Sequence, residues 1–535
     1  RIDGGQQFFT RANDFGYSKS PEETFDVWGK DEILSDVIKV FRQYQPDVII
    51  TRFPPDGGGG HGPHTASAIL AGEAFDLAAK ADVYPDQVKA FGTWQVKRLF
   101  TNTGRWWNNT INENTPGIIT LDVGGYNALL GKSYTEISAL SSSQHKSQGW
   151  GRRGVRGYEP EFLELQKGEK ADHDIFDGVN TTWSRLKNGD KIHASVNKLI
   201  ADFNEENPAA IVPALFQLRK QIASLDESVW KTRKLQETEQ LIKDCLGLFT
   251  EVTAAHYQGS PGARIKTSFE VINRSAAEVR LEKVSASKLA WDTAYAASLR
   301  PNNAVMVTTT RPQLDASADH SDPYWLKEPH TTGRFTVPDK DYIGLPENPP
   351  AVEFTFTFSV NGEKFNVTSP LIYKWVDPVK GELWRPFEIV PAVFINLGEK
   401  VIVFNSESSK EISLTVRSSV NEAVSGTLSL RLPAGWKCDP SETSFELSGR
   451  DEGVVKSFTI YPSAKESTGE ITTIAKVEGK EYSHSLDLVS YDHFPIQTLL
   501  PSATAKVIRI DLKKEGQMIG YIGGPGDDTP SALRN

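Results

Sequence analysis

The spacing of apolar residues changes near residue 263, and this change constrains the fold more than any other feature. Before it, apolar side chains recur with a helical period, as in the segment 31–44. After it, they alternate with polar residues, as in 352–359, which leads into an Asn-Gly hairpin signal at 361–362. Both periods in one chain predict several domains, α/β first and β-rich later. Its 535 residues allow about three or four of them.

The first part of the chain predicts an α/β unit. A helix is expected at 31–44, then a short β-branched strand at 47–51 and, after a glycine-rich loop, an Ala-rich helix at 65–79. A strand at 118–123 and a helix at 134–148 continue the pattern. This order is typical of open α/β sheets, which bind ligands beyond the carboxyl ends of their strands.

The later parts predict a helical spacer and two β-sandwiches. Helical spacing continues through 191–255, with a plausible helix start at 207–208. Short alternating strands with frequent turn residues follow, and a segment bounded by prolines at 386–391 divides them. The expected fold class is therefore multidomain, with a partial α/β Rossmann-like domain, a helical spacer, two immunoglobulin-like β-sandwiches and the start of a further α/β domain.

Composition excludes several classes of function. The net charge is −10, whereas broad nucleic-acid binding needs basic patches, so we expect no nucleic-acid partner. No apolar run approaches the roughly 18 residues that a membrane span requires, so no span is expected. The two cysteines, Cys245 and Cys438, are too few and too far apart for a disulfide framework or a zinc ribbon.

The strongest local signal for chemistry is the segment 57–64, four glycines followed by His-Gly-Pro-His. It lies just beyond the expected strand 47–51, where open sheets bind ligands. Pro63 suits the first turn of a helix, which places His64 in that turn and His61 just ahead of it. Neutral imidazoles bind metals, and glycines let the backbone approach an ion or a substrate. The alternative, from spacing alone, is a flexible loop with two exposed histidines.

Together with its flanks 46–51 and 65–67, this segment resembles the second metal motif of the PIG-L/LmbE-like N-deacetylases. The run 145–148, His-Lys-Ser-Gln, resembles the closing His-x-Ser-Gln signature of that family. The segments 3–9 and 126–132 resemble a multidomain bacterial branch of it. The resemblance covers roughly residues 1–175.

This resemblance implies a zinc enzyme that hydrolyses the N-acetyl amide of an N-acetylglucosamine-type conjugate. Zinc would polarise the acetyl carbonyl and activate a water. By the same resemblance, His64 is the third metal ligand, and His61 lies where the family has a histidine near the developing oxyanion or the leaving group. His145 and Gln148, one turn apart late in the helix 134–148, could line the same substrate cleft. The alternative for these two is a pair that packs the helix.

The sequence departs from the family pattern in two respects. It contains no His-Pro-Asp-Asp-Glu motif, which in the family supplies two zinc ligands and the aspartate base. We expect this motif ahead of Arg1 in a longer chain; the rival interpretation is a protein that has lost it. In addition, Pro63 stands where the family often has an aspartate that orients the histidines.

The expected domains combine these patterns with two further resemblances. The segment 432–436 resembles NEW3 modules of bacterial sugar-processing enzymes, with Trp436 expected in the core, and the C-terminus resembles the opening of an amidotransferase-like domain. The pair Trp106-Trp107 is either a sugar-stacking edge or, more commonly for such pairs, core and rim. The expected boundaries are 1–175 for the deacetylase part, 176–258 for the spacer, 259–385 and 386–490 for the β-sandwiches, and 491–535 for the truncated α/β domain.

Three functions follow as hypotheses. The first is a zinc N-deacetylase whose substrate is an amino-sugar conjugate or glycan, inactive as this chain alone because the first motif is missing. The second is a non-catalytic carbohydrate-binding protein that keeps the deacetylase fold. The third is a nucleotide-binding enzyme, suggested only by the glycine-rich turn at 523–526. The β-sandwich appendages and the scarcity of cysteine suit a periplasmic, cell-surface or secreted location.

Overall fold

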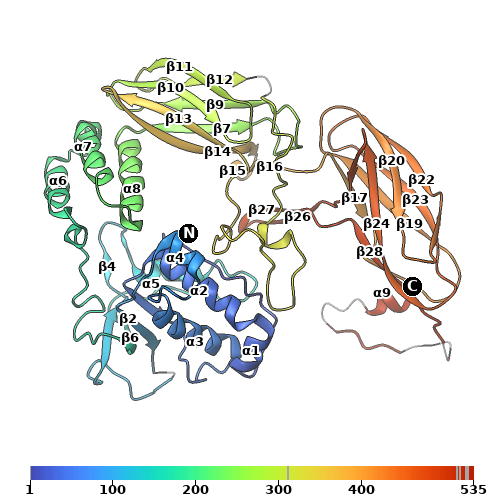
Figure 1. Cartoon of the computed structure of the whole chain (residues 1–535), viewed down its shortest axis with the longest axis horizontal. Helices are drawn as coiled ribbons and strands as arrows, with labels where there is room; N and C mark the ends of the chain where they lie inside the picture. The colour runs from blue at the N-terminus through green and yellow to red at the C-terminus, as the bar shows by residue number, and fades with distance from the viewer. Residues whose placement is uncertain are drawn as a thin grey trace. The chain divides into compact units, whose positions relative to one another are not determined.

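A computed structural model describes the chain at residues 2–105, 107–309, 312–513, 516, 518, 520–524 and 529–534. The chain forms two compact units, and each unit is built from two separate segments. The first unit comprises residues 1–390 and 488–499, and the second comprises 391–487 and 500–535. Figure 1 labels the helices and strands of both units.

The first unit begins with a four-stranded sheet in the order β1-β2-β6-β3. Its strands are β1 (Val48–Thr51), β2 (Arg98–Thr103), β3 (Ile118–Asp122) and β6 (Pro160–Gly168). β1 and β2 are parallel, whereas β6 is antiparallel to both β2 and β3. The strands expected at 47–51 and 118–123 are confirmed. The sheet is mixed, however, and β2 lies where the sequence pattern predicts no strand.

Helices cover one face of this sheet. They are α1 (Pro21–Trp28), α2 (Lys30–Tyr44), α3 (Gly62–Leu77) and α4 (Pro85–Phe91). The helices predicted at 31–44 and 65–79 are thus confirmed. Buried Ile38 of α2, Leu70 of α3 and Leu99 of β2 share one core. The opposite face carries a smaller core around Phe100, which consists of strand and loop residues. The two faces of the sheet are therefore unequally covered.

Between β3 and β6 the chain forms a lobe, residues 124–158, that leaves the sheet. It contains β4 (Tyr126–Asn127), β5 (Lys132–Ser133) and α5 (Tyr134–Ser142). The helix predicted at 134–148 therefore ends at Ser142, so that part of the prediction is wrong. A run of three serines explains the early end, because serine hydroxyls bond to nearby backbone and favour helix ends; the Ser142 hydroxyl donates to the Ala139 carbonyl at 3.3 Å.

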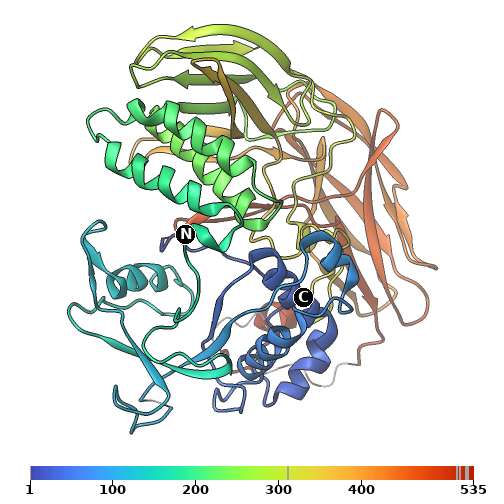
Figure 2. The same ribbon diagram turned by 60° about the vertical axis from the view of Figure 1, so that its left-hand side comes forward.

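The spacer after the α/β part is helical. Its elements are η1 (Trp183–Arg185), α6 (Gly189–Asp202), η2 (Pro208–Ile211), α7 (Val212–Ala223) and α8 (Val229–Cys245). The helical pattern predicted to 255 ends earlier, because Gly247 adopts a left-handed φ of 55° and strand β7 begins at Phe249. The helices share a core with the β-strands that follow, and Figure 2 shows them against one side of that sheet.

The β-rich part of the first unit is sandwich-like. Its eight-stranded sheet has the order β11-β10-β13-β14-β7-β9-β12, with β15 also paired to β14. The strands are β7 (Phe249–Ala254), β9 (Thr267–Ile272), β10 (Val279–Ala286), β11 (Asp292–Leu299), β12 (Val305–Thr309), β13 (Glu353–Val360), β14 (Glu363–Asp377) and β15 (Gly381–Pro386). The first half of β14 pairs with β13 and its second half with β7 and β15, so one strand passes between two layers.

The alternation predicted at 352–359 is confirmed by burial. Phe354, Phe356 and Phe358 of β13 are fully buried, whereas the polar residues between them are less so. The ring of Phe356 meets that of Phe269 in β9 edge to face, with centroids 5.5 Å apart, and this contact joins the two layers. A long loop that includes η3 (Tyr324–Leu326) connects β12 to β13 and has a small apolar cluster of its own.

The C-terminal segment 488–499 belongs to the first unit through a buried polar cluster. β27 (Phe494–Leu499) pairs with β26 (Asp487–Tyr491), and β8 (Gln258–Gly259) pairs with β16 (Glu388–Ile389). Buried Arg385 donates to Glu388 at 3.0 Å and to Thr498 at 2.8 Å. Burial raises the pKa of the Glu388 carboxyl above its usual range, although Arg385 acts in the opposite sense.

The second unit is a β-sandwich. One sheet has the order β17-β19-β23-β21 and the other β18-β28-β24-β20-β22, with β25 paired to β24. The strands are β17 (Val393–Leu397), β18 (Val401–Phe404), β19 (Lys410–Ser418), β20 (Val424–Arg431), β21 (Lys437–Asp439), β22 (Glu442–Leu447), β23 (Gly453–Tyr461), β24 (Ser467–Val477), β25 (Lys480–Tyr482) and β28 (Thr504–Arg509). Trp436 is buried as predicted, with its ring edge-on to Phe404.

The C-terminal boundary differs from the sequence prediction. Instead of opening a further α/β domain at 491, the chain adds β28 to the larger sheet of the second sandwich, between β18 and β24. The expected strand near 519–522 is absent at the described residues 520–522, while Ile519 and 525–528 lie outside the described residues. A short helix, α9 (Thr529–Arg534), follows. Among the described residues, no helix is long and apolar enough to cross a membrane.

Candidate functional site

The glycine loop and the start of α3 bring the two predicted site histidines together. β1 ends at Thr51, and α3 begins at Gly62 with His61 as its N-cap residue in extended conformation. Pro63 lies in the first helical turn, as predicted, and the backbone N–H of Gly62 donates to the Ser18 carbonyl at 2.9 Å. The histidines are therefore held at a helix N-terminus that follows the carboxyl end of a parallel strand.

Aromatic rings fix the positions of both imidazoles. The ring centroids of His61 and His64 lie 4.9 Å apart. His64 is stacked on Phe53, with centroids 3.8 Å apart and planes 4° from parallel. Tyr17 meets His61 edge to face at 4.9 Å. Each imidazole is thus held by one aromatic neighbour, so neither ring is a freely rotating surface side chain.

The polar atoms of the two imidazoles differ in their hydrogen bonding. His64 Nδ1 lies 3.5 Å from the Gly59 carbonyl; with the proton on Nδ1 this contact leaves the lone pair of Nε2 free. His61 Nδ1 is buried, and within the described part of the chain it has no hydrogen-bond partner. A buried nitrogen without a partner costs free energy unless water or a bound group satisfies it, so this atom is a candidate contact for a ligand.

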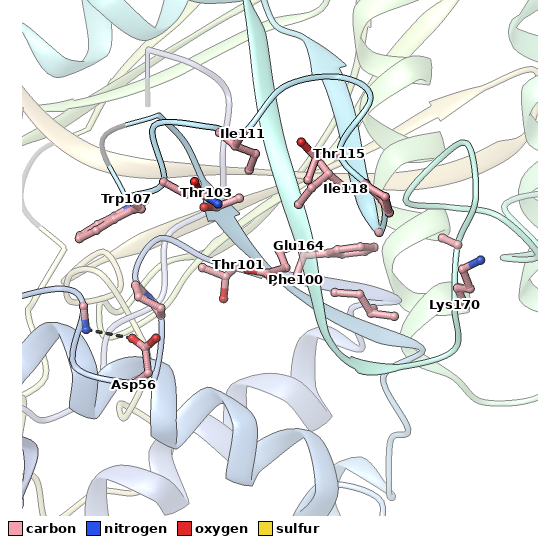
Figure 3. Close-up of a pocket in the computed structure, with 17 residues that line it drawn as sticks. Asp56, Phe100, Thr101, Thr103, Trp107, Ile111, Thr115, Ile118, Glu164 and Lys170 are labelled. Carbon is pink, nitrogen blue, oxygen red and sulfur yellow. Dashed lines mark hydrogen bonds between the residues drawn. The ribbon is translucent and has the colours of Figure 1, made fainter.

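A cavity of about 630 Å³ opens beside this loop and is lined by residues from both faces of the sheet. Figure 3 shows Asp56 and Trp107 at one end and Lys170 at the other. Trp107 links the cavity to the histidines, because its ring lies 6.1 Å from that of Phe53. The lining residues are Pro54, Asp56, Gly58, Phe100, Thr101, Thr103, Trp107, Asn108, Ile111, Thr115, Pro116, Gly117, Ile118, Glu164, Leu165, Lys170 and Ala171.

Most of these lining residues are missed by sequence reasoning. Thr101 and Thr103 belong to β2, which the periodicity does not predict, and Glu164 comes from β6, far along the chain. For the two threonines the only signal in the sequence is the run Leu-Phe-Thr at 99–101, too brief to distinguish from a loop. Of the predicted tryptophan pair, Trp107 lines the cavity and Trp106 lies outside the described residues.

Asp56 and Arg52 stabilise the loop itself. Asp56 is exposed, and its carboxylate accepts a hydrogen bond from the backbone N–H of Gly58 at 2.9 Å, which is a local turn bond. Arg52 is also exposed, and its guanidinium donates to Asn102 of β2. Through these bonds, Asp56 stabilises the turn at Gly58, and Arg52 connects the loop to β2.

His145 and Gln148 lie elsewhere in the lobe. Because α5 ends at Ser142, they are in a turn rather than on a helix face, and the Gln148 N–H donates to the His145 carbonyl at 3.2 Å. Both side chains are exposed, and the His145 ring lies 5.8 Å from Trp150. Neither residue is among those that line the cavity. The helix-packing alternative also fails, since no helix continues to these positions.

The two histidines near α3 are of a residue type that binds metals, but they are too few to form a metal site by themselves. Across the described stretches of the chain, no three His, Cys, Asp or Glu side chains lie close enough to hold a metal ion. Zinc sites use three or four protein ligands. His61 and His64 are the right kind of ligand but supply at most two. A metal held here would need ligands beyond these two histidines.

Comparison with known proteins reveals only weak likenesses. No family model and no curated protein matches the chain. Among solved structures, it is similar to Escherichia coli α2-macroglobulin activated by porcine elastase, at 9% identity and a TM-score of 0.17 over 49% of this chain and 22% of that one. It is also similar to a cohesin–dockerin complex from Clostridium thermocellum, at 10% identity and a TM-score of 0.13 over 22% of this chain and 100% of that one.

The chain spans about a fifth of the length of the α2-macroglobulin that it matches. Fold overlap at TM-scores this low says nothing about activity. What the chain can do must therefore be argued from its own site.

Proposed function

We propose that the chain is part of a zinc-dependent N-deacetylase that acts on an N-acetylglucosamine-type conjugate. One observation carries the proposal. The ring centroids of His61 and His64 lie 4.9 Å apart at the N-terminus of α3, just past the parallel strand β1, and His61 Nδ1 is buried without a partner among the residues that the structure describes. The resemblance of segment 46–67 to the second metal motif of the PIG-L/LmbE-like enzymes points in the same direction.

In this proposal His64 is the zinc ligand that the chain provides. Its contact with the Gly59 carbonyl favours the tautomer with the proton on Nδ1, which leaves Nε2 to bind the metal. The remaining ligands are not in this sequence, which lacks a His-Pro-Asp-Asp-Glu motif. When bound, zinc supplies a Lewis acid that polarises the acetyl carbonyl and lowers the pKa of a water.

His61 acts on the substrate in this proposal. Its imidazole is held by Tyr17, and in the described ranges of the chain its Nδ1 has no protein partner that a substrate oxygen would have to displace. A protonated imidazole there can donate a hydrogen bond to the oxygen that gains charge, or a proton to the amine that leaves. Pro63 stands where the family often has an aspartate that orients the histidines. In this chain, Tyr17 and the loop hold the His61 imidazole in position instead.

The cavity beside the loop is where we place the sugar. Its polar lining includes Thr101, Thr103 and Asn108, and Trp107 offers an aromatic edge. Small polar groups with one aromatic ring suit a sugar ring. We further propose an extracytoplasmic location for the protein, on the grounds of its appended β-sandwich units.

The same cavity supports a second candidate function, a carbohydrate-binding protein without catalysis. This alternative uses Trp107 and the polar lining but requires nothing of His64. The two candidates differ in what zinc does. A deacetylase needs the metal at His64, whereas a binding protein takes up sugar equally well with zinc present or removed.

We expect zinc added to the 535-residue chain to perturb the His64 imidazole. Nitrogen-detected NMR of the imidazoles should show a shift at His64 Nε2, because metal binding uses that lone pair. His64→Ala should weaken zinc binding at least about tenfold, since it removes a primary ligand. His193, an exposed histidine on α6, is the matched control and should neither shift nor affect affinity as His193→Ala. An unshifted His64 both in this chain and in a fusion that supplies the missing motif would remove it as a ligand.

Activity is tested by supplying the missing motif. We expect a fusion that places an apolar strand ending in His-Pro-Asp-Asp-Glu ahead of Arg1 to release acetate from an N-acetylglucosamine conjugate, and the chain without it to release none. His64→Ala in the fusion should abolish release, and His61→Ala should lower turnover about a hundredfold while keeping zinc. Zinc and sugar binding by the fusion without acetate release would instead support the carbohydrate-binding alternative.

A further inference from the structure

The lobe, residues 124–158, is folded but has almost no apolar core. It leaves the sheet at Val123 and returns at Glu159, where the Val123 N–H donates to the Glu159 carbonyl at 2.9 Å. Within it only Gly124, Ser133 and Ala139 are buried. Figure 2 shows α5 and the loops around it at the left-hand side of the view. The large apolar side chains of the lobe must therefore face outward.

Eight large apolar side chains of the lobe are exposed. Leu129 is 97% exposed, Tyr126 71% and Trp150 62%, far more than a core residue allows. So many exposed large apolar side chains in one short lobe are a signal of an interaction site. The complete set is Tyr126, Leu129, Leu130, Tyr134, Leu140, Trp150, Val155 and Tyr158.

Hydrogen bonds hold the leucine pair in a defined turn. The Asn127 side-chain oxygen accepts from the N–H of Leu129 at 3.0 Å and of Leu130 at 3.2 Å, and the Gly131 N–H donates to the Asn127 carbonyl at 2.8 Å. Tyr126 lies opposite Ser133 in the β4–β5 pair, next to Tyr134. The turn thus presents two leucines flanked by two tyrosines, and it needs no ordering before contact.

The charge of the lobe is opposite to that of the chain. The lobe carries five Lys and Arg residues against the single Glu136, a net charge of +4, whereas the whole chain has a net charge of −10. Its cations are exposed, and one of them, Arg156, pairs with Glu136 at 2.8 Å. The Arg152 guanidinium donates a hydrogen bond to the Ser138 hydroxyl at 2.5 Å. The cations are Lys132, Lys146, Arg152, Arg153 and Arg156.

We propose that the lobe docks the protein onto an anionic lipid surface. Leucines at the tip would enter the acyl boundary, tyrosines and the tryptophan would lie at headgroup level, and the cations would meet the phosphates. An acidic glycan would suit the aromatic rings and cations but leave Leu129 and Leu130 in water. The exposed leucines therefore favour a lipid surface, and the docking is peripheral.

The test uses the whole chain and co-sedimentation with vesicles. We expect binding to phosphatidylcholine vesicles that contain a minority of phosphatidylglycerol, little binding to phosphatidylcholine alone, and weaker binding as salt is added. Leu129→Ser with Leu130→Ser should weaken binding about tenfold. Lys146→Gln with Arg153→Gln should weaken it about twentyfold.

Matched controls separate these effects from general changes in the surface. Leu241→Ser replaces a leucine on α8 that is 49% exposed, and Lys187→Gln with Lys191→Gln removes two exposed cations outside the lobe; both should leave binding unchanged. Absence of vesicle binding, or equal binding by the lobe variants, would overturn the proposal. So would binding to an acidic polysaccharide without vesicle binding, or a dimer, seen by light scattering, that the leucine variant abolishes.

Discussion

Gly62→Ala should destabilise the α/β part of the first unit by about 2–3 kcal/mol, measured as a lower free energy of unfolding. A methyl group at this position would lie 2.4 Å from the Ser20 carbonyl oxygen and 2.5 Å from the hydroxyl oxygens of Ser18 and Thr24. None of these atoms can move easily, because Ser20 is the N-cap of α1 and its carbonyl accepts from the Thr24 hydroxyl at 3.1 Å. The start of α3 would have to shift away from α1.

The same substitution should also disturb the site, because His61 and His64 flank Gly62. We expect the zinc-dependent shift at His64 to weaken in parallel with stability. Gly72→Ala is the matched control on the same helix, since its methyl group would have only the end of the Lys167 side chain, at 3.7 Å, nearby. That change should raise stability by up to about 1 kcal/mol, as Gly→Ala does inside helices. Equal stability of the two variants would contradict the packing argument.

Arg42→Met should cost roughly 3 kcal/mol of unfolding free energy. Arg42 of α2 is fully buried, and its guanidinium donates to the carbonyls of Ala78 at 3.1 Å, Lys80 at 2.8 Å and Val83 at 2.9 Å. These carbonyls lie at and beyond the C-terminal end of α3, where a helix leaves its last acceptors unpaired. Methionine fills similar volume but removes the donors to the Lys80 and Val83 carbonyls, whereas the Ala78 carbonyl keeps the Trp94 N–H at 3.1 Å.

A conservative variant distinguishes hydrogen bonding from packing. Arg42→Lys keeps the charge but supplies one nitrogen in place of three, so it should lose about half as much stability as Arg42→Met. Chemical denaturation followed by tryptophan fluorescence measures both, since Trp28 and Trp94 belong to or pack against this core. A loss for Arg42→Met of less than about 1 kcal/mol would show that water replaces the guanidinium at these carbonyls.

Local patterns predicted many of the elements. The helices at 31–44 and 65–79, the strands at 47–51 and 118–123 and the alternation in β13 all depend on periodicity within a short window. Predictions failed at the ends of helices, since α5 ends at its serine run and the spacer helices end before Gly247. The last domain boundary was also wrong, because β28 pairs with β18 and β24, which belong to the second sandwich.

Some features of the candidate site were also predictable from the sequence, and others were not. His61 and His64 are neighbours because a helix with Pro63 in its first turn begins between them. The local sequence pattern predicts this helix start. Their aromatic supports could not be foreseen, since Tyr17 comes from the N-terminal segment and the Phe53 contact depends on how the loop folds back. His145 and Gln148 show the opposite case, where a local helix pattern suggested a shared face that the structure does not form.

Local sequence patterns identified several helices and strands and the pairing of the two histidines, because backbone preferences and hydrophobic period act between residues close in the chain. The packing of distant segments decided that Gly62 must lack a side chain, that Arg42 completes the end of α3, that a cavity opens beside the glycine loop and that the leucines of the lobe face outward. Each of these features depends on whether segments that are distant in the sequence pack against each other, and a local sequence pattern does not specify that packing.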